Sequence, residues 1–147
     1  MKPSPLAREL TRLIGPDAVL WRPEDLMLYE YDALSCLKEP QAVVFPLSTE
    51  DVVAVVKLAA REKLPVVPRG SGTGLSGGSV VTEGGIVVAF ARMKKILEVD
   101  LENLRARVQP GVVNMDLTLA VSDHGLYFAP DPSSQKACTI GGNVAEN

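Results

Sequence analysis

Apolar residues recur at three- and four-residue intervals in three stretches, and each stretch predicts an amphipathic helix. The first covers residues 6–14 and stops at Gly15-Pro16. The second begins after Ser48, whose hydroxyl can accept a hydrogen bond from a free amide at the helix start, and runs to about Lys63. The third covers about 114–123, with Gly125 beyond its end as a left-handed cap.

Short apolar runs between these helices predict β-strands. The runs are 42–45, 66–67, 86–90, 96–99, 105–109 and 126–128. The order of strand, helix and strand from 42 to 67 predicts a βαβ unit with parallel strands and a right-handed crossover. Asp100 to Asn103 are expected to form a hairpin turn, whereas residues 17–40 carry no clear pattern and are expected to be irregular.

Glycines gather in the connection 69–85, above all in Pro68-Arg69-Gly70-Ser71-Gly72-Thr73-Gly74-Leu75-Ser76-Gly77-Gly78. Residues without a Cβ adopt positive φ at little cost, so successive backbone N–H groups can turn toward one point and form an anion cradle. Ser71, Thr73 and Ser76 add hydroxyl donors, and Arg69 adds a cation at the entrance. The loop is therefore interpreted as a phosphate-binding loop.

Two familiar phosphate motifs resemble this loop but fail. Gly72-x-Gly74-x-x-Gly77 matches the letters of the dinucleotide fingerprint, yet residues 79–85 lack the helical pattern that must follow it. In a nucleoside-triphosphate loop a lysine would stand at Gly78. A flexible surface connection remains the structural alternative, although a long loop in a compact domain is usually functional or disordered.

A second group of turn residues follows the predicted strand 126–128. Pro130-Asp131-Pro132-Ser133-Ser134 is stiffened by its prolines, and Thr139-Ile140-Gly141-Gly142-Asn143 begins another helix. The glycine pair allows close approach of a ligand, and the helix start is expected to offer unpaired N–H groups to an anion.

Composition narrows the function classes. Apolar residues make up 46% of the 147 positions, and the net charge is −3, so the chain can build a core but lacks the cationic excess of a nucleic-acid surface. Cys36 and Cys138 cannot build a disulfide framework, and Cys138 is expected to be a small buried residue. The single histidine, His124, is interpreted as a helix C-terminal cation. Without a long apolar run or a signal peptide, a soluble protein of the cytoplasm is expected.

Four motifs in order carry a resemblance to a known superfamily: PRGSGTGLSGG, QPGV at 109–112, PDPSS and TIGGNVAEN. Together they resemble the PCMH-type FAD-binding domain of the vanillyl-alcohol oxidase flavoprotein superfamily. Within it, the likeness is greatest to the FAD-binding D subunit of bacterial glycolate oxidase and to D-lactate dehydrogenases. The resemblance spans roughly residues 40–147.

The resemblance implies that FAD is the cofactor and assigns residues to it. In covalently flavinylated relatives a histidine stands at the position of Thr73, so threonine here implies non-covalent FAD. No catalytic or metal-binding residue is assigned to the chain. The implied cofactor-binding residues are Pro68, Arg69, Gly70, Ser71, Gly72, Thr73, Gly74, Leu75, Pro130, Asp131, Ser133, Ser134, Cys138, Thr139, Gly141, Gly142 and Asn143.

The resemblance also implies an α+β fold of two lobes, a small βαβ lobe and a second mixed-sheet lobe cut short at its C-terminal end. Residues 1–39 are expected to form an N-terminal helical arm and residues 40–147 an incomplete FAD-binding domain, with the substrate domain absent. The implied activity is oxidation of a small D-2-hydroxy acid, glycolate or D-lactate, by hydride transfer to flavin, with the residues 1–147 inactive by themselves.

Other functions of the same lobes stay open at this point. An electron-transfer flavin subunit without its own substrate site is one, a flavin reductase of cell-wall precursor synthesis is another, and an inactive FAD-binding fragment is a third. The implied partners are a small 2-hydroxy acid and the other subunits of a glycolate oxidase complex, with no nucleic acid and no transmembrane segment.

Overall fold

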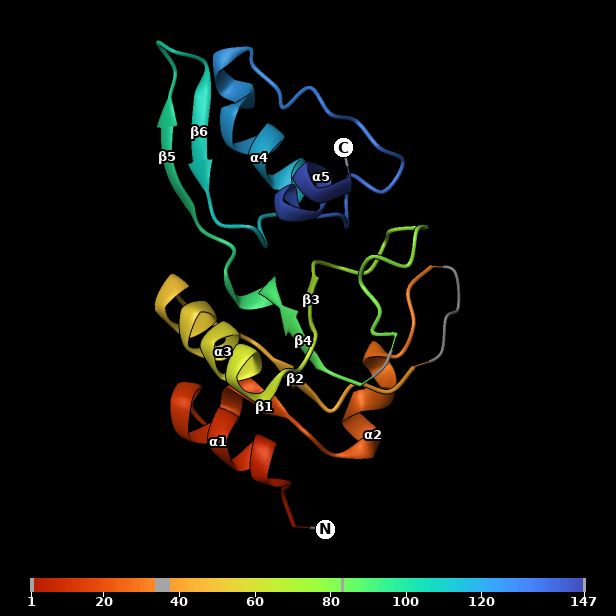
Figure 1. Ribbon diagram of the computed structural model, residues 1–147. Coiled ribbons are helices and arrows are strands. Elements are labelled where there is room, and N and C mark those ends of the chain that lie inside the picture. The colour runs from red at the N-terminus through yellow and green to blue at the C-terminus, as the bar shows by residue number, and fades with distance from the viewer. Residues whose placement is uncertain (1, 34–37, 83, 147) are drawn as a thin grey trace.

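The computed structural model describes residues 2–33, 38–82 and 84–146, so Cys36 and Asn147 lie outside the described residues. Figure 1 shows two lobes stacked along the long direction of the molecule, with the N-terminus in the lower lobe and the C-terminus in the upper. The lower lobe contains a four-stranded sheet, and the upper contains a two-stranded hairpin and two helices. The expected α+β fold of two lobes is confirmed.

The sheet of the first lobe has the order β1-β2-β4-β3. Its strands are β1 (Val19–Leu20), β2 (Ala42–Val44), β3 (Val66–Arg69) and β4 (Ile86–Ala89). β2 and β3 both run parallel to β4, and β1 runs antiparallel to β2. The parallel direction of the βαβ unit was predicted, but β4 lies between its two strands.

Alternate residues of the central strands face opposite sides of the sheet. Ala42 and Val44 of β2 pack in one core cluster, and Val43 between them packs in the other. Ile86–Ala89 of β4 divide in the same way, and all four residues are buried. A parallel sheet covered on both faces has this continuous apolar character.

Helices cover both faces of this sheet. α1 (Pro5–Ile14) and α3 (Thr49–Glu62) contribute Leu10 and Val55 to one cluster, and α2 (Pro23–Leu26) contributes Leu26 to the other. Figure 1 shows α1 and α3 on one side of the sheet and α2 on the other. The N-terminal helix is therefore packed into the core of the first lobe.

Local capping sets the ends of α3. The Ser48 hydroxyl accepts a hydrogen bond from the Asp51 amide at 3.2 Å, and the Asp51 carboxylate accepts one from the Ser48 amide at 3.2 Å. This reciprocal pair satisfies two amides at the helix start. At the other end Lys63 adopts the left-handed conformation with φ 55° and ends the helix.

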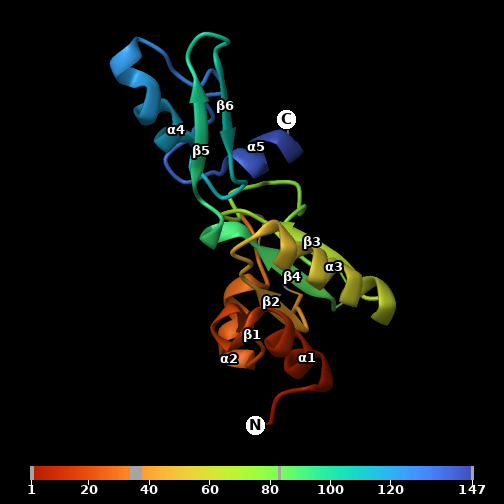
Figure 2. The same ribbon diagram turned by 90° about the vertical axis from the view of Figure 1, so that its left-hand side faces the viewer.

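The second lobe is built on the antiparallel hairpin of β5 (Ile96–Asp100) and β6 (Arg105–Val108). α4 (Asn114–Val121) and α5 (Ile140–Glu146) contribute Leu117 and Ile140 to a cluster with Val112, and Ile96 and Val108 of the hairpin pack against it. Figure 2 shows the hairpin rising beside α4. Short 3₁₀ turns lie at Pro16–Ala18, Met27–Tyr29, Phe90–Arg92 and Ser122–His124.

Residues 126–128 do not form the predicted strand. The Phe128 amide donates to the Thr118 hydroxyl at 3.2 Å, and the Phe128 ring packs on the cluster of Val112 and Leu117. A strand requires a neighbouring strand to pair with, and none of the described residues supplies one here. The segment is therefore an extended connection held by side-chain contacts.

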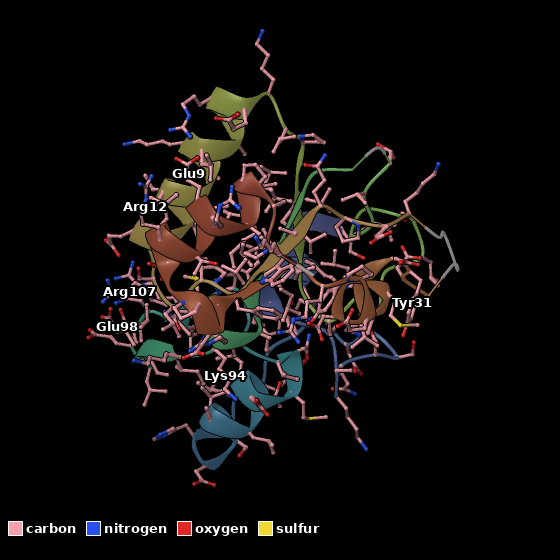
Figure 3. All side chains as sticks on the ribbon, turned by 90° about the horizontal axis from the view of Figure 1, so that it is seen from below. Glu9, Arg12, Tyr31, Lys94, Glu98 and Arg107 are labelled. Carbon is pink, nitrogen blue, oxygen red and sulfur yellow. The ribbon has the colours of Figure 1, made fainter. Side chains whose placement is uncertain are left out.

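Charged side chains pair on the surface of both lobes. Figure 3 shows Glu9 near Arg12 and Glu98 near Arg107, and the shortest N–O distances in these pairs are 3.5 and 3.2 Å. Exposed pairs of this kind contribute little to stability. In the described part of the chain, no helix has the length and apolar character needed to span a lipid bilayer.

The cap of α3 provides a test of how the first lobe is stabilised. Replacing Ser48 by alanine removes the hydroxyl acceptor and is expected to lower the free energy of unfolding by about 1 kcal/mol, measured by urea denaturation. Ser76→Ala is the matched control, because Ser76 is exposed and makes no hydrogen bond to any described residue. Equal stability of the two variants would contradict the role of the cap.

Candidate functional site

A cavity of about 520 Å³ lies between the two lobes. It is lined from below by the glycine-rich loop after β3 and from above by the start of α5 and the segment before it. The sequence-predicted residues that line it are Pro68, Arg69, Gly70, Ser71, Gly72, Thr73, Gly74, Pro130, Ser134, Cys138, Thr139, Gly141, Gly142 and Asn143.

Three of the predicted site residues do not line this cavity. Leu75 is 66% exposed, and Asp131 and Ser133 are exposed as well. Each stands next to a lining residue in the chain but presents its side chain elsewhere. Motif membership alone therefore does not place a side chain in the cavity.

The two loops meet directly at one point. Gly70 lies so close to Thr139 that a Cβ added at Gly70 would overlap the Thr139 hydroxyl oxygen. Beside it, the Ser71 hydroxyl donates to the Ala137 carbonyl at 2.6 Å. The turns near residues 72 and 141 therefore border one shared cavity.

The first loop carries amides without partners. The backbone N–H groups of residues 71–76 donate no hydrogen bond to any other described residue. Gly72 and Gly77 have φ of 73° and 74°, which turns successive peptide groups in a way that residues with a Cβ rarely allow. This pattern is typical of a backbone anion site.

The second loop behaves differently from the sequence expectation. The amides of Ile140 and Gly141 donate to the carbonyls of Val112 and Pro110 at 2.8 and 2.9 Å. The Asn143 amide donates to the Thr139 carbonyl, and the Gly142 amide approaches the Thr139 hydroxyl at 3.4 Å. The prediction of unpaired N–H groups at this helix start is wrong, because the lobe itself uses them.

Gly141 matters instead as a point of close packing. A Cβ there would lie 2.8 Å from the Pro110 Cβ and 2.9 Å from the Pro110 oxygen. The absence of a side chain lets the turn of 109–112 and the start of α5 approach each other. The second loop therefore supplies a close-packed wall of the cavity.

Arg69 is more buried than a cation at a loop entrance would be. Its side chain ends β3, the residue is 7% exposed, and the guanidinium donates to the Ser79 carbonyl at 3.2 Å. Burial lowers the pKa of Arg69, and the nearby Tyr29, Asp32 and Tyr31 oppose that effect. The guanidinium also lies 5.5 Å from the centre of the Tyr29 ring.

Asn114 positions the second loop and was missed by the sequence reasoning. It is fully buried at the start of α4, its side-chain amide donates to the Pro130 carbonyl at 3.0 Å, and its backbone amide donates to the Cys138 carbonyl at 3.0 Å. Asn114 thus holds both ends of the 130–138 segment. The available signal was its place three residues before Leu117, on the buried face of a predicted helix.

Other lining residues lay outside the predicted set: Gly78, Ser79, Phe90, Pro110, Pro132, Ala145 and Glu146. Phe90 follows β4 at the connection to the second lobe, and Pro110 lies in the turn between β6 and α4; sequence periodicity places neither of them. The side-chain oxygens of Ser79 and Asn143 are buried without a hydrogen-bond partner. Such orphaned polar atoms in a cavity wall indicate a site for a polar ligand.

The remaining candidate side chains take structural positions. Cys138 is buried as a free thiol, and His124 ends the turn that follows α4. Trp21 packs against the core of the first lobe. Among residues 2–33, 38–82 and 84–146, no group of three His, Cys, Asp or Glu side chains is arranged to hold a metal ion.

Comparison with known proteins gives a consistent result. A family described as "FAD binding domain" matches residues 40–147. The chain is 50% identical over 130 residues to the glycolate oxidase subunit GlcD of Escherichia coli K12, covering 88% of this chain and 26% of that protein. It is 39% identical over 148 residues to a D-lactate dehydrogenase of Anaerostipes hadrus, covering 99% and 31%.

A solved structure of alkyldihydroxyacetonephosphate synthase matches with a TM-score of 0.85 and 25% identity, covering 98% of this chain and 29% of that one. The chain therefore spans about a quarter to a third of the length of the relatives that it matches. These similarities extend over both lobes.

The contact of Gly70 with Thr139 can be tested by a compensating pair. Gly70→Ala is expected to lower the free energy of unfolding by roughly 1–3 kcal/mol, because the new Cβ overlaps the Thr139 hydroxyl. Adding Thr139→Ala should recover most of that loss, since the nearest remaining atom, the Thr139 Cβ, lies at 3.5 Å.

The matched control is Gly74→Ala, whose Cβ would have its nearest contact at 3.9 Å. Denaturation of wild type, Gly70→Ala, Thr139→Ala and the double variant supplies a double-mutant cycle. Additive effects of Gly70→Ala and Thr139→Ala would show that the lobes do not meet at this point.

Proposed function

The chain belongs to the FAD-binding domain family and its cofactor is FAD; on that premise we propose that the cavity between its lobes binds the FAD diphosphate and the adjoining flavin side. The observation that carries the proposal is the run of unpaired amides at 71–76, because residues 71–74 line the cavity together with Thr139, Gly141, Gly142 and Asn143. A diphosphate is the part of FAD that converging N–H groups recognise.

The residues of the cavity fit this group. Residues 71–74 line the cavity with unpaired backbone amides, and the buried Ser79 hydroxyl has no hydrogen-bond partner among the described residues. On the opposite wall the Asn143 side-chain oxygen is also unpartnered. A volume of about 520 Å³ lies within the range of roughly 300–1,000 Å³ typical of ligand sites.

The proposed roles follow from these positions. The amides of 71–74 hold the diphosphate, while Pro130, Ser134, Cys138, Thr139 and residues 141–143 line the flavin side. The sequence motifs also include Leu75, Asp131 and Ser133, which do not line the cavity. A role for them in binding FAD requires that the cofactor extend beyond the cavity. Thr73 offers no imidazole for a histidyl linkage, which supports non-covalent attachment.

The bound flavin supplies the redox chemistry by accepting a hydride equivalent from the substrate. The chain's own contribution is to bind and orient the cofactor. Among the described residues, the only titratable side chains that line the cavity are Arg69, Cys138 and Glu146. None is a histidine, and Arg69 is engaged with Ser79. We propose that the base that removes the substrate hydroxyl proton comes from outside the described residues 2–33, 38–82 and 84–146.

The proposed reaction is oxidation of a small D-2-hydroxy acid, glycolate or D-lactate. The names of two relatives, a glycolate oxidase subunit and a D-lactate dehydrogenase, support this substrate class. The word "subunit" in the first name supports assembly with other subunits. Residues 40–147 would be the FAD-binding part of that enzyme and residues 1–39 its N-terminal arm. Its location in the cytoplasm stays a prediction.

The first test measures FAD binding with a matched glycine pair. FAD at 100 times its dissociation constant should raise the free energy of unfolding by about 2.7 kcal/mol. Gly72→Ala should weaken FAD binding roughly tenfold or more, because a Cβ there overlaps the Arg69 guanidinium and disturbs the loop. The readout is quenching of FAD fluorescence during titration.

Gly125→Ala serves as its control. Gly125 has φ 70° against 73° for Gly72, so both substitutions impose similar backbone strain, but Gly125 does not line the cavity and has open space around it. Equal loss of FAD affinity in both variants would contradict the role of the 71–76 loop. If the wild-type sequence binds no FAD, either as this chain or as part of a longer protein that contains it, the proposal itself is contradicted.

A second test addresses the substrate. The full-length gene product, loaded with FAD and kept anaerobic, should lose its flavin absorbance near 450 nm on addition of glycolate or D-lactate. Residues 1–147 with FAD should not, since the proton-accepting base is placed outside them. Bleaching by the short chain would overturn that placement. Full-length protein that holds FAD but responds to neither acid would favour an electron-transfer subunit.

A further inference from the structure

We propose that Arg69 acts on the cofactor site as a positioning residue: its guanidinium holds the glycine-rich loop in shape, and the Tyr29 ring holds the guanidinium. The inference rests on the proposed binding of FAD between the lobes. It assigns Tyr29, which lies outside the glycine motifs, to the support of that site.

The Arg69 side chain contacts the loop at two further positions, Ser79 and Gly72. The residue itself ends β3, its Nη1 donates to the Ser79 carbonyl at 3.2 Å, and Gly72 packs against the guanidinium where a Cβ could not fit. The guanidinium thus ties together positions 69, 72 and 79. Arginine suits this task, because its planar group presents several fixed donors on one rigid frame.

The loop has few other internal ties. Within 70–80, the backbone hydrogen bond between described residues is that of the Val80 amide with the Gly77 carbonyl, at 3.3 Å. The amides of 71–76 donate no backbone hydrogen bonds, so backbone pairing does not hold this segment in shape. Its conformation must therefore come from side-chain contacts, and Arg69 supplies those on the side of the first lobe.

The loop also has open space behind it. A second cavity of about 460 Å³ is lined by Tyr29, Tyr31 and Phe45 of the first lobe, and residues 69–72 line both cavities. Figure 3 shows Tyr31, which lines the second cavity, beside α2 at the edge of the first lobe. Residues 69–72 therefore border two cavities. Support for this segment has to come from the side chains that line them, and Tyr29 lines the second cavity.

Tyr29 provides that support. Its ring centre lies 5.5 Å from the Arg69 guanidinium carbon, a distance within the range of a cation–π contact. The ring is held in turn by an edge-to-face contact with Phe45, with centres 5.9 Å apart, and packs on the buried cluster that includes Val43. Its hydroxyl makes no hydrogen bond to a described residue, so the ring carries the interaction.

The test compares variants that keep the charge with variants that keep the ring. Tyr29→Leu removes the platform and is expected to weaken FAD binding roughly tenfold, while Tyr29→Phe recovers most of the affinity. Arg69→Lys keeps the positive charge but cannot contact Gly72 and Ser79 together, and is expected to weaken binding at least as much. The double variant should bind no more weakly than Arg69→Lys alone.

The opposite pattern would overturn the inference. If Arg69 served only as a charge for the diphosphate, Arg69→Lys would retain affinity, Tyr29→Leu would bind as wild type, and the two changes would add. Leu26→Ala is the control, because Leu26 belongs to the same buried cluster and lines neither cavity beside the loop. Failure of wild type to bind FAD would count against the proposed function instead.

A titration checks the Tyr29–Arg69 contact without FAD. Burial raises the pKa of Tyr29, and the positive charge of Arg69 opposes that rise by favouring the phenolate. Arg69→Met is therefore expected to raise the Tyr29 pKa further, followed by phenolate absorbance in a Tyr31→Phe, Tyr127→Phe background. An unchanged Tyr29 pKa would show that the two groups are not in contact, and the inference would fail.

Discussion

The contact of Gly70 and Ser71 with Thr139 and Ala137 is the constraint on which the site depends. It joins segments that lie 66 positions apart in the chain, measured between Ser71 and Ala137, and it brings a loop of the first lobe against the start of α5. Only a glycine at position 70 leaves room for the Thr139 side chain. The cavity lies beside this contact, and residues of both loops line it.

The two loops then divide the work of binding. The loop after β3 keeps its amides at 71–76 unpaired, whereas the start of α5 uses its amides to attach itself to Val112 and Pro110. The first loop can offer its backbone N–H groups to an anion because they donate no hydrogen bonds within the described part of the chain. The same lack of internal bonds requires an outside support, which the buried Arg69 and the Tyr29 ring provide.

Much of the fold was predictable where the signals are local. Ser48 and Asp51 mark the start of α3, and Gly125 ends the segment after α4 in the left-handed conformation that was expected. The two residues of β1 were missed, since so short a strand exists only through its pairing with β2. The strand predicted at 126–128 was wrong for the related reason that pairing needs a partner.

By itself the sequence determined which two loops border the cavity and most of the residues that line it, because glycine and proline motifs limit backbone shape over a few positions and family membership follows from their order. The tertiary structure decided how each residue serves. It placed β4 between β2 and β3, turned Arg69 inward onto Tyr29, buried Asn114 behind the second loop and paired the amides of α5. Those outcomes depend on contacts between residues distant in the chain, which no local pattern encodes.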